Sequence, residues 1–415
     1  MPKQDSDYTV RINELIKKYE REGRKWYRLT GADMPMTGHR NKALTKLLIQ
    51  AVEEGWDYYI TETPWPQEFK EAAANYEKKY FNLNVSADDI MIVAGAADGW
   101  NLIHNSILAI GDNTIAPEPS HYLTGPVSYF WRLGAEVIQV PSIESEGWDP
   151  DIEKLRSSIN KKTKAICLDN PNNPTGAIYS DKAKKAIIDI AGENDIPVIS
   201  DELYRQITYD GYEAPSMASY SKDVPVIVLT SFSKYFMMPG WRIGYVCFYD
   251  PEEKISNIKD ICNRIVTTYG HHQSGVACPV LVAATRALRE QIDTWWFMGN
   301  EMAIKGGLDE SKEMMRKLKV RRDYSIKRME EIDGLNVVKS KASIYMFPKV
   351  DGIGKVWKTT GDFLLDLFKE EAVIFNNGES YGKSGFGHFR TMVLDDLEKL
   401  EDIYNRLDKY LRMHR

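Results

Sequence analysis

Short apolar runs alternate with helical patterns through the middle of the chain. Runs rich in β-branched residues predict strands at residues 89–94, 113–117, 135–141, 164–168, 197–200, 226–230 and 243–248. Between some of these runs, apolar residues recur every three or four positions, which predicts helices at residues 98–110 and 180–193. Strands divided by helices indicate a mostly parallel sheet with both faces covered.

The two ends of the chain carry a different pattern. Helical spacing predicts helices at residues 8–22, 42–54, 67–80, 309–333 and 363–371. Short strand-like runs at 335–338 and 344–347 separate the last two. The final helix places apolar residues on one face, namely Leu397, Leu400, Tyr404, Leu407 and Leu411. We therefore expect a second, smaller α+β domain after the sheet.

Composition places the chain among ordinary globular enzymes. Its 415 residues are enough for two domains, with 43% hydrophobic and 27% charged residues. Lys and Arg number 54 against 60 Asp and Glu, and no basic stripe favours nucleic acid as a partner. The absence of a long apolar run and of an apolar signal core predicts neither a membrane span nor secretion, so we expect a cytoplasmic protein.

Cysteine and histidine show no pattern typical of a metal site. The four cysteines have no CxxC spacing, and we expect them to be reduced and structural. The seven histidines form no metal-ligand pattern either, so the sequence predicts no metal.

A distinctive polar turn follows the predicted strand 226–230. Lys234 stands there close to the hydroxyl groups of Ser231 and Ser233, with the guanidinium of Arg242 eight residues further on. This set suits a phosphate held beside a reactive amine. Such an arrangement is what pyridoxal phosphate (PLP) requires of a protein. Taken alone, the stretch fits equally well a solvent-exposed loop lysine beside serines that shape a turn.

Other strands end in chemically distinctive residues, at the edge of a parallel sheet where ligands bind. Ala96 and Ala97 open a helix, whose free N–H groups form an anion site. The turn 169–176, rich in Asn, Pro and Gly, presents an amide at a fixed angle. Asp201 ends a buried strand with Tyr204 three residues on, and a protonated pyridine nitrogen would be a suitable partner for its charge.

In these motifs the chain resembles the class I and II aminotransferases, which are PLP-dependent enzymes of fold type I. The matching motifs are Asn172-Asn-Pro-Thr-Gly176, Asp201-Glu-Leu-Tyr204, Ser231-Phe-Ser-Lys234, Gly240-Trp-Arg-Ile-Gly244 and Gly387-His-Phe-Arg390. The resemblance covers essentially the whole chain and implies an α/β fold: a large domain with a mostly parallel, seven-stranded-type sheet and a smaller α+β domain. The predicted division is an N-terminal segment 1–55 that joins the small domain, a large domain 56–300 and a small domain 301–415.

The resemblance also implies roles for the residues around the cofactor. Lys234 would bind the cofactor aldehyde and later move the proton of the substrate α-carbon, while Asp201 would keep the pyridine nitrogen protonated. Tyr204 and Asn173 would contact the ring hydroxyl oxygen. The implied phosphate contacts are Ala96, Ala97, Ser231, Ser233 and Arg242.

Substrate and partner contacts follow from the same resemblance. Arg390 would bind the substrate α-carboxylate with both arms of its guanidinium, together with Asn173 and the backbone of Gly31. Members of the family build each site at a homodimer interface. By this likeness Tyr59 would reach the phosphate of the neighbouring subunit.

Two positions bear on the ring contact and on substrate preference. His121 stands where the family places an aromatic ring stacked on the cofactor, with Tyr122 as the adjacent alternative. Ala97 stands where one subgroup of aspartate aminotransferases has a lysine for the second substrate carboxylate. Aspartate preference therefore lacks that support.

The predicted function is transfer of an amino group from an L-amino acid, with aspartate-like or broad specificity, to a 2-oxoacid such as 2-oxoglutarate. A carbon-sulfur β-lyase of the same fold is the alternative, because the same residues can start either reaction. A non-catalytic PLP-binding regulator is disfavoured, since the first 25 residues are too short for a helix-turn-helix domain.

Overall fold

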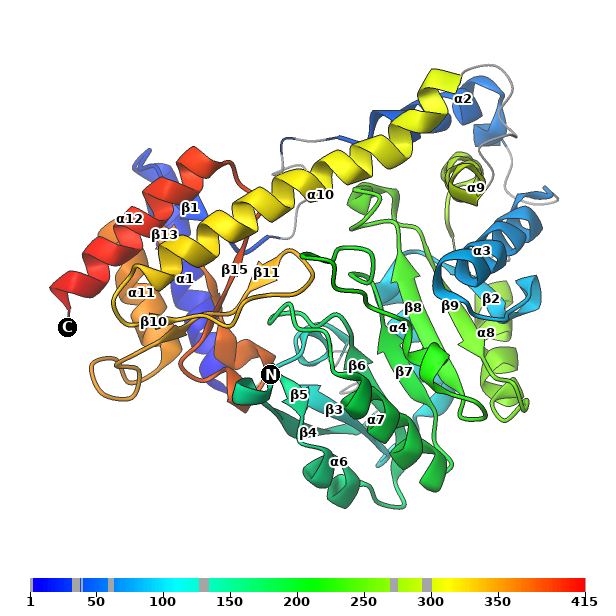
Figure 1. The fold of residues 1–415 in the computed structure, drawn as a ribbon, viewed down its shortest axis with the longest axis horizontal. Coiled ribbons are helices and arrows are strands. Elements are labelled where there is room, and N and C mark those ends of the chain that lie inside the picture. The colour runs from blue at the N-terminus through cyan, green and yellow to red at the C-terminus, as the bar shows by residue number, and fades with distance from the viewer. Residues whose placement is uncertain are drawn as a thin grey trace.

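A computed structural model describes residues 3–31, 38, 40–58, 63–126, 134–268, 275–292 and 301–414. Within these residues, eight strands form one sheet in the order β2-β9-β8-β7-β6-β3-β4-β5 (Figure 1). They are β2 (Ile90–Val93), β3 (Asn113–Glu118), β4 (Glu136–Ile143), β5 (Asp149–Pro150), β6 (Thr163–Asp169), β7 (Val198–Asp201), β8 (Val226–Ser231) and β9 (Gly244–Tyr249). Strands β9 and β5 run antiparallel to their neighbours. The mostly parallel sheet of seven predicted strands is thus confirmed, with the two-residue β5 added at one edge.

Helices cover both faces of this sheet. Among the described residues before Glu301, the α-helices are α1 (Lys3–Arg21), α2 (Lys42–Glu53), α3 (Trp65–Phe81), α4 (Ala96–Ile107), α6 (Ile152–Ser158), α7 (Asp181–Glu193), α8 (Ser256–Thr268) and α9 (Cys278–Ile292). Along β6, Ile166 and Leu168 pack in the cluster that contains α3, α7 and α9. Ala165 and Cys167 pack in the opposite cluster, with α4 and α8. This period-two alternation buries both faces of the strand, as parallel sheets require.

The sequence patterns above do not identify α8 and α9. Helix α8 nevertheless buries Ile258, Cys262 and Val266, which are spaced four residues apart on one face. Because only a few apolar residues mark that face, its helical period is hard to distinguish from a loop.

The C-terminal elements form a second layer beside the sheet (Figure 1). They comprise α10 (Glu301–Glu330), α11 (Thr360–Glu371) and α12 (Leu397–Met413), with the short strands β10 (Leu335–Asn336), β11 (Tyr345–Met346), β12 (Lys349–Val350), β13 (Val373–Ile374), β14 (Asn376–Asn377) and β15 (Phe389–Met392). Most of these strands have only two residues, too few for a periodic signal. Of the predicted core positions in the last helix, Leu397 is exposed at its start and the other four are buried.

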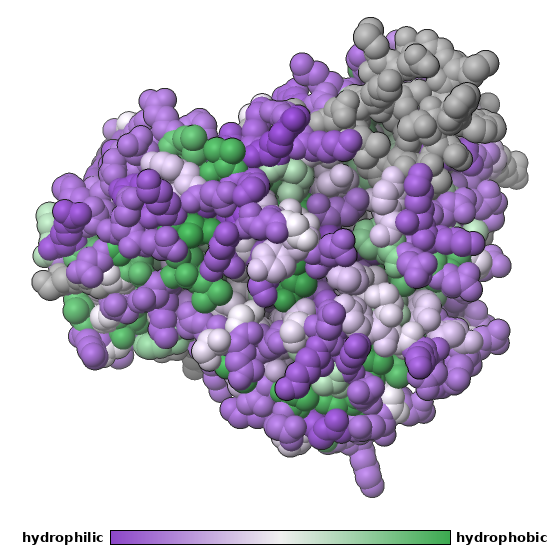
Figure 2. Space-filling model, in the orientation of Figure 1, coloured by the Kyte–Doolittle hydropathy of each residue, from purple (hydrophilic) through white to green (hydrophobic). Residues whose placement is uncertain are grey.

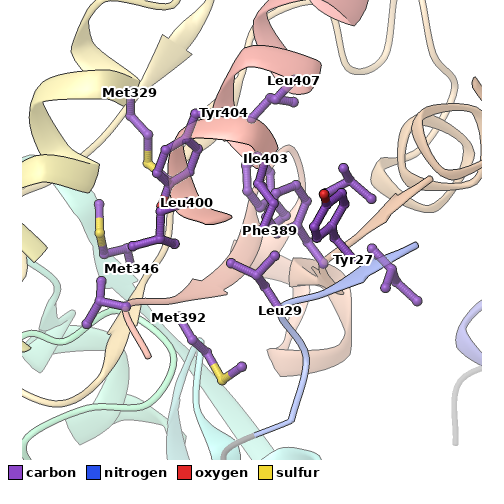
Figure 3. Close-up of a cluster of buried hydrophobic side chains, with 14 of the residues drawn as sticks. Tyr27, Leu29, Met329, Met346, Phe389, Met392, Leu400, Ile403, Tyr404 and Leu407 are labelled. Atoms are coloured by element: carbon purple, nitrogen blue, oxygen red, sulfur yellow. The ribbon is translucent and has the colours of Figure 1, made fainter. Parts of the chain in front are cut away.

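The N-terminal segment packs against these C-terminal elements. Strand β1 (Tyr27–Arg28) pairs in parallel with β13, and α1 adds Ile12 and Tyr19 to the same core. Figure 3 shows Tyr27 and Leu29 beside Phe389, with Ile403 of α12 close by. These contacts attach the part of segment 1–55 up to Leu29 to the small domain, whereas Leu44 and Leu47 of α2 pack in the cluster that contains α3, α7 and α9. The domain boundaries themselves remain a prediction.

Hydrophilic residues cover most of the face shown in Figure 2, and hydrophobic ones gather there in small, separate patches. Within the described ranges, no helix combines the length and apolarity needed to span a membrane. All four cysteines are buried and free, as expected.

A buried ionic cluster supports the turn that follows β7. The Arg205 guanidinium donates to Glu77 of α3 at 3.0 Å and to Glu202 at 3.1 Å. The hydroxyl group of Tyr245 also donates to Glu77, and the backbone N–H of Met217 donates to Glu202 at 2.8 Å. Since all three charged residues are almost fully buried, each charge depends on these partners. The cluster thereby ties α3 to the turn that carries Asp201 and Tyr204.

We predict that Arg205→Met destabilises the fold by about 3–5 kcal/mol, because Glu77 and Glu202 would stay buried without a cation. Urea unfolding, with the cofactor removed, measures this loss. Arg156→Met is the matched control, since Arg156 pairs with Glu193 at the surface, where such pairs contribute about 0–1 kcal/mol. Equal effects of the two substitutions would contradict the role assigned to the buried cluster.

Candidate active site

One end of the site is built where β2 meets α4. Gly95 has φ +87°, a backbone conformation that favours glycine, and its Cα lies close to the guanidinium of Arg242. The same guanidinium donates to the carbonyl of Ala94 at 3.2 Å. Ala96 and Ala97 form the first turn of α4, whose N–H groups and dipole favour an anion. Helix terminus and guanidinium together suit a phosphate.

Two serines complete this end from the neighbouring strands. Ser231 ends β8 and pairs with Gly244 of β9, which brings Arg242 to the same edge of the sheet. The hydroxyl oxygens of Ser231 and Ser233 lie 2.7 Å apart, and the backbone N–H of Ser233 donates to the Ser231 hydroxyl at 3.0 Å. Lys234 follows in a turn closed by a bond from the Met237 N–H to its carbonyl. The lysine is half-buried beside the anion-binding residues.

Asp201 lies at the end of β7, deep in the site. Its Oδ2 accepts a hydrogen bond from Nε1 of Trp100 at 3.1 Å, and its Oδ1 accepts one from the backbone N–H of Leu203 at 3.2 Å. Burial raises the pKa of Asp201 to about 6, while the bond from Trp100 and the positive charge of Lys234 oppose that rise. Near neutral pH the group is therefore mostly a carboxylate.

Asp169 is a second buried carboxyl group, and sequence reasoning did not single it out. It is the register partner of Asp201 on the adjacent strand. It accepts hydrogen bonds from the Ser120 hydroxyl and from the backbone N–H of Asn173, the latter at 2.7 Å. Burial raises its pKa to about 7. The signal available in the sequence was an acidic residue directly after the apolar run 165–168.

The structure separates the two candidates for the ring contact. Tyr122 is buried, with its hydroxyl 3.0 Å from that of Thr114. His121 is instead exposed, and its Nδ1 lies 2.7 Å from the hydroxyl oxygen of Thr124. The imidazole at position 121 is thus the ring available to a flat ligand.

Arg390 forms the other end of the site, on β15. Its guanidinium donates to the side-chain oxygens of Asn173 at 3.0 Å and Asn376 at 2.8 Å, and to the carbonyl of Thr30 at 3.1 Å. These partners are neutral, and Nε of Arg390 is buried with no hydrogen-bond partner among the described residues. Gly31 follows Thr30 and is half-buried there. A carboxylate would supply the missing negative charge.

Tyr345 is a site residue that sequence reasoning missed. Its hydroxyl lies 2.8 Å from that of Tyr204, and its ring centre lies 4.3 Å from the guanidinium carbon of Arg390. Burial raises the pKa of Tyr204 well above its usual value, so the phenol stays protonated. The run 344–347 marked a strand, but no local signal placed its tyrosine beside a motif 141 residues away.

The predicted residues therefore gather at one edge of the sheet, with one exception. The structure brings together Gly31, Ala96, Ala97, His121, Asn173, Asp201, Tyr204, Ser231, Ser233, Lys234, Arg242 and Arg390. Tyr59 lies outside the described residues, and the individual roles remain predictions. Across the part of the chain that the structure describes, no cluster of three or more His, Cys, Asp or Glu side chains could hold a metal ion.

Comparison with known proteins decides the family. The profile of "Aminotransferase class I and II" matches residues 41–407. The chain belongs to this family. An aspartate aminotransferase of Pyrococcus horikoshii is 30% identical over 365 residues, which cover 87% of this chain and 85% of that protein. A glutamate-pyruvate aminotransferase of Haemophilus influenzae is 25% identical over 347 residues, or 83% of this chain and 81% of the other.

A solved structure supports the same family assignment for this aminotransferase. The alanine aminotransferase of Pyrococcus furiosus superimposes with a TM-score of 0.86 at 35% identity, covering 98% of this chain and 96% of the other. The chain is therefore a PLP-dependent transaminase of fold type I, as the sequence motifs predict.

The site residues of this aminotransferase fit both the phosphate and the ring of PLP. The α4 terminus, the two serines and Arg242 would hold the phosphate. Asp201 would place its carboxylate at the ring nitrogen, and Lys234 would supply the amine for the aldehyde.

We predict that Arg390→Lys lowers kcat/KM for amino acids by about 30-fold or more, because losing the planar fork at a buried carboxylate costs at least about 2 kcal/mol. Activity toward the matching amine without a carboxylate should not change. PLP affinity should also persist. Arg390 contacts none of the residues assigned to the phosphate, and of the residues assigned to the ring it contacts only Asn173.

Arg406→Lys on α12 is the matched control for this prediction, because Arg406 pairs with Asp402 away from the site. If Arg390→Lys reduced kcat/KM for the amino acid and for the amine equally, or changed neither, Arg390 would not be the residue that binds the carboxylate.

Proposed function

We propose that this aminotransferase moves amino groups from α-amino acids to 2-oxoglutarate, with broad donor specificity that includes small neutral donors such as alanine. The observation that carries the proposal is the buried Arg390, whose hydrogen-bond partners are neutral oxygens. A substrate α-carboxylate would provide its counter-charge and would lie beside Asn173.

Donor preference rests on two further observations. Ala97 is exposed at the start of α4, where a lysine would be needed to pair with a second donor carboxylate as in one aspartate-specific subgroup. The P. furiosus neighbour, similar over nearly the whole chain, is an alanine aminotransferase. Both favour neutral donors over a strict preference for aspartate.

Each site residue has a separate role in the proposed reaction. Bound PLP supplies an aldehyde that joins to amines and a ring that withdraws electrons from the substrate α-carbon. Lys234 moves the proton at that carbon, and Asp201 holds a positive charge on the ring nitrogen. Tyr204, kept protonated by burial, would donate a hydrogen bond to the ring hydroxyl oxygen of bound PLP. Arg390 and Asn173 hold the carboxylate in a fixed orientation, which places the α-carbon for proton transfer.

A panel of donors with 2-oxoglutarate as acceptor tests this function. We expect glutamate formation from alanine, aromatic and branched-chain donors, with aspartate not preferred over alanine. Lys234→Ala should abolish glutamate formation with every donor. Release of ammonia and pyruvate from sulfur-containing amino acids, without 2-oxoglutarate, would instead support the β-lyase alternative.

We further propose a cytoplasmic homodimer with shared active sites. Ile49 and Val52 of α2, together with Tyr58 in the turn after it, expose large apolar side chains that an obligate interface would cover. Four free, buried cysteines support a reducing compartment.

Mixing two inactive variants tests the shared site. If Tyr59 acts across the interface, heterodimers of Lys234→Ala and Tyr59→Phe chains contain one site with neither substitution, so activity should return after subunit exchange. A mixture of Lys234→Ala with Lys234→Ala carrying Tyr59→Phe is the control and should stay inactive. No recovery in the first mixture, with exchange verified, would show that Tyr59 does not serve the partner.

A further inference from the structure

Asp201 is held by one side-chain donor that none of the family motifs above includes. Among the described residues, its two side-chain oxygens accept hydrogen bonds from the Trp100 indole at 3.1 Å and from the Leu203 backbone N–H at 3.2 Å. Trp100 is 2% exposed, so the indole N–H is not available to bulk water. Each carboxylate oxygen thus has one fixed donor, which restrains rotation of the carboxylate plane.

Helix α4 places this indole relative to the other end of the site. Ala96 and Trp100 are four residues apart and therefore lie on the same helix face. Gly99 lets the helix approach the sheet, because a Cβ there would lie only 3.0 Å from side-chain carbons of Leu229 and Val246. Helix α4 therefore carries both the anion-binding first turn and the Trp100 indole that donates to Asp201.

A neutral aromatic cluster holds the indole in place. The ring of Tyr122 lies 4.8 Å from that of Trp100 and the ring of His104 lies 5.2 Å from it. The Tyr122 hydroxyl lies 3.2 Å from Nε2 of His104. Burial lowers the pKa of His104 to about 3, so this cluster carries no charge that would compete with Lys234 for Asp201.

We propose that Trp100 is a positioning residue that orients the Asp201 carboxylate toward the ring nitrogen of the cofactor and stabilises its negative charge. The inference rests on the proposed role of Asp201 and adds the residue through which the rest of the protein controls it. Loss of the indole N–H leaves a buried carboxylate with a missing donor, so the group becomes less ordered and less readily charged.

The test compares binding of two cofactors to the apoenzyme: PLP, and 1-deaza-PLP, in which C–H replaces the ring nitrogen. We expect Trp100→Phe to weaken PLP binding about tenfold, the usual effect of losing one hydrogen bond to a charged group. Binding of 1-deaza-PLP should not change, because that analogue cannot use Asp201. In an Asp201→Ala background, Trp100→Phe should have no further effect on either ligand.

Two further variants separate positioning from packing. Trp357→Phe removes another buried indole donor, which bonds to Tyr410 at 3.1 Å in the C-terminal layer, and should leave both affinities unchanged. A variant with 3-benzothienylalanine at position 100 keeps the fused rings and replaces N–H by sulfur, so it should reproduce the selective loss while the fold is retained.

The outcomes distinguish a failure of the role proposed for Trp100 from a failure of the role proposed for Asp201. Equal losses for PLP and 1-deaza-PLP, or no loss for either, in both position-100 variants would overturn the role of Trp100 alone. If Asp201→Ala did not change the preference for PLP over its deaza analogue, the assignment of Asp201 to the ring nitrogen would itself be wrong.

Discussion

A negative charge at the end of strand β7, whose other residues are buried, is the constraint on which the site depends. Parallel strands buried on both faces direct their carboxyl ends to one edge, where water is scarce and charges need partners. Asp201 meets that requirement with Trp100, Leu203 and the nearby Lys234. The residues that keep this carboxylate charged are therefore those that prepare the site for a cationic ring.

The C-terminal layer reaches the same edge through a few polar contacts. Arg390 on β15 donates a hydrogen bond to Asn173 in the turn after β6, and the hydroxyl of Tyr345 on β11 lies 2.8 Å from that of Tyr204. Asn173 is thus shared between the proposed carboxylate site and the proposed cofactor site. A substrate carboxylate at Arg390 would consequently act on residues that also touch the cofactor, and it would hold the two layers together over the reacting carbon.

The parts of the structure that were predictable are those with a local signal. Apolar runs with β-branched residues predict strands β6 and β8. Asp201 and Lys234 are identified as polar residues that follow such runs. Trp100 and Tyr345 could not be found this way, because each acts on a partner more than 100 residues distant. An isolated Trp within a helix pattern is ordinarily a core residue, and only the fold shows that its N–H meets a carboxylate. Two-residue strands such as β5 are likewise products of packing.

The charge balance of the site explains why two carboxyl groups can lie on adjacent strand ends. Asp169 and Asp201 are register partners, and like charges at such positions disfavour double ionisation. Asp169 has the higher pKa, about 7 against about 6, because burial and the neighbouring charge of Asp201 raise it, whereas the charge of Lys234 lowers the pKa of Asp201. Near neutral pH most of the paired charge therefore lies on Asp201. Lys234, Arg242 and Arg390 supply positive charge that would offset the charges of a bound phosphate and of a substrate carboxylate.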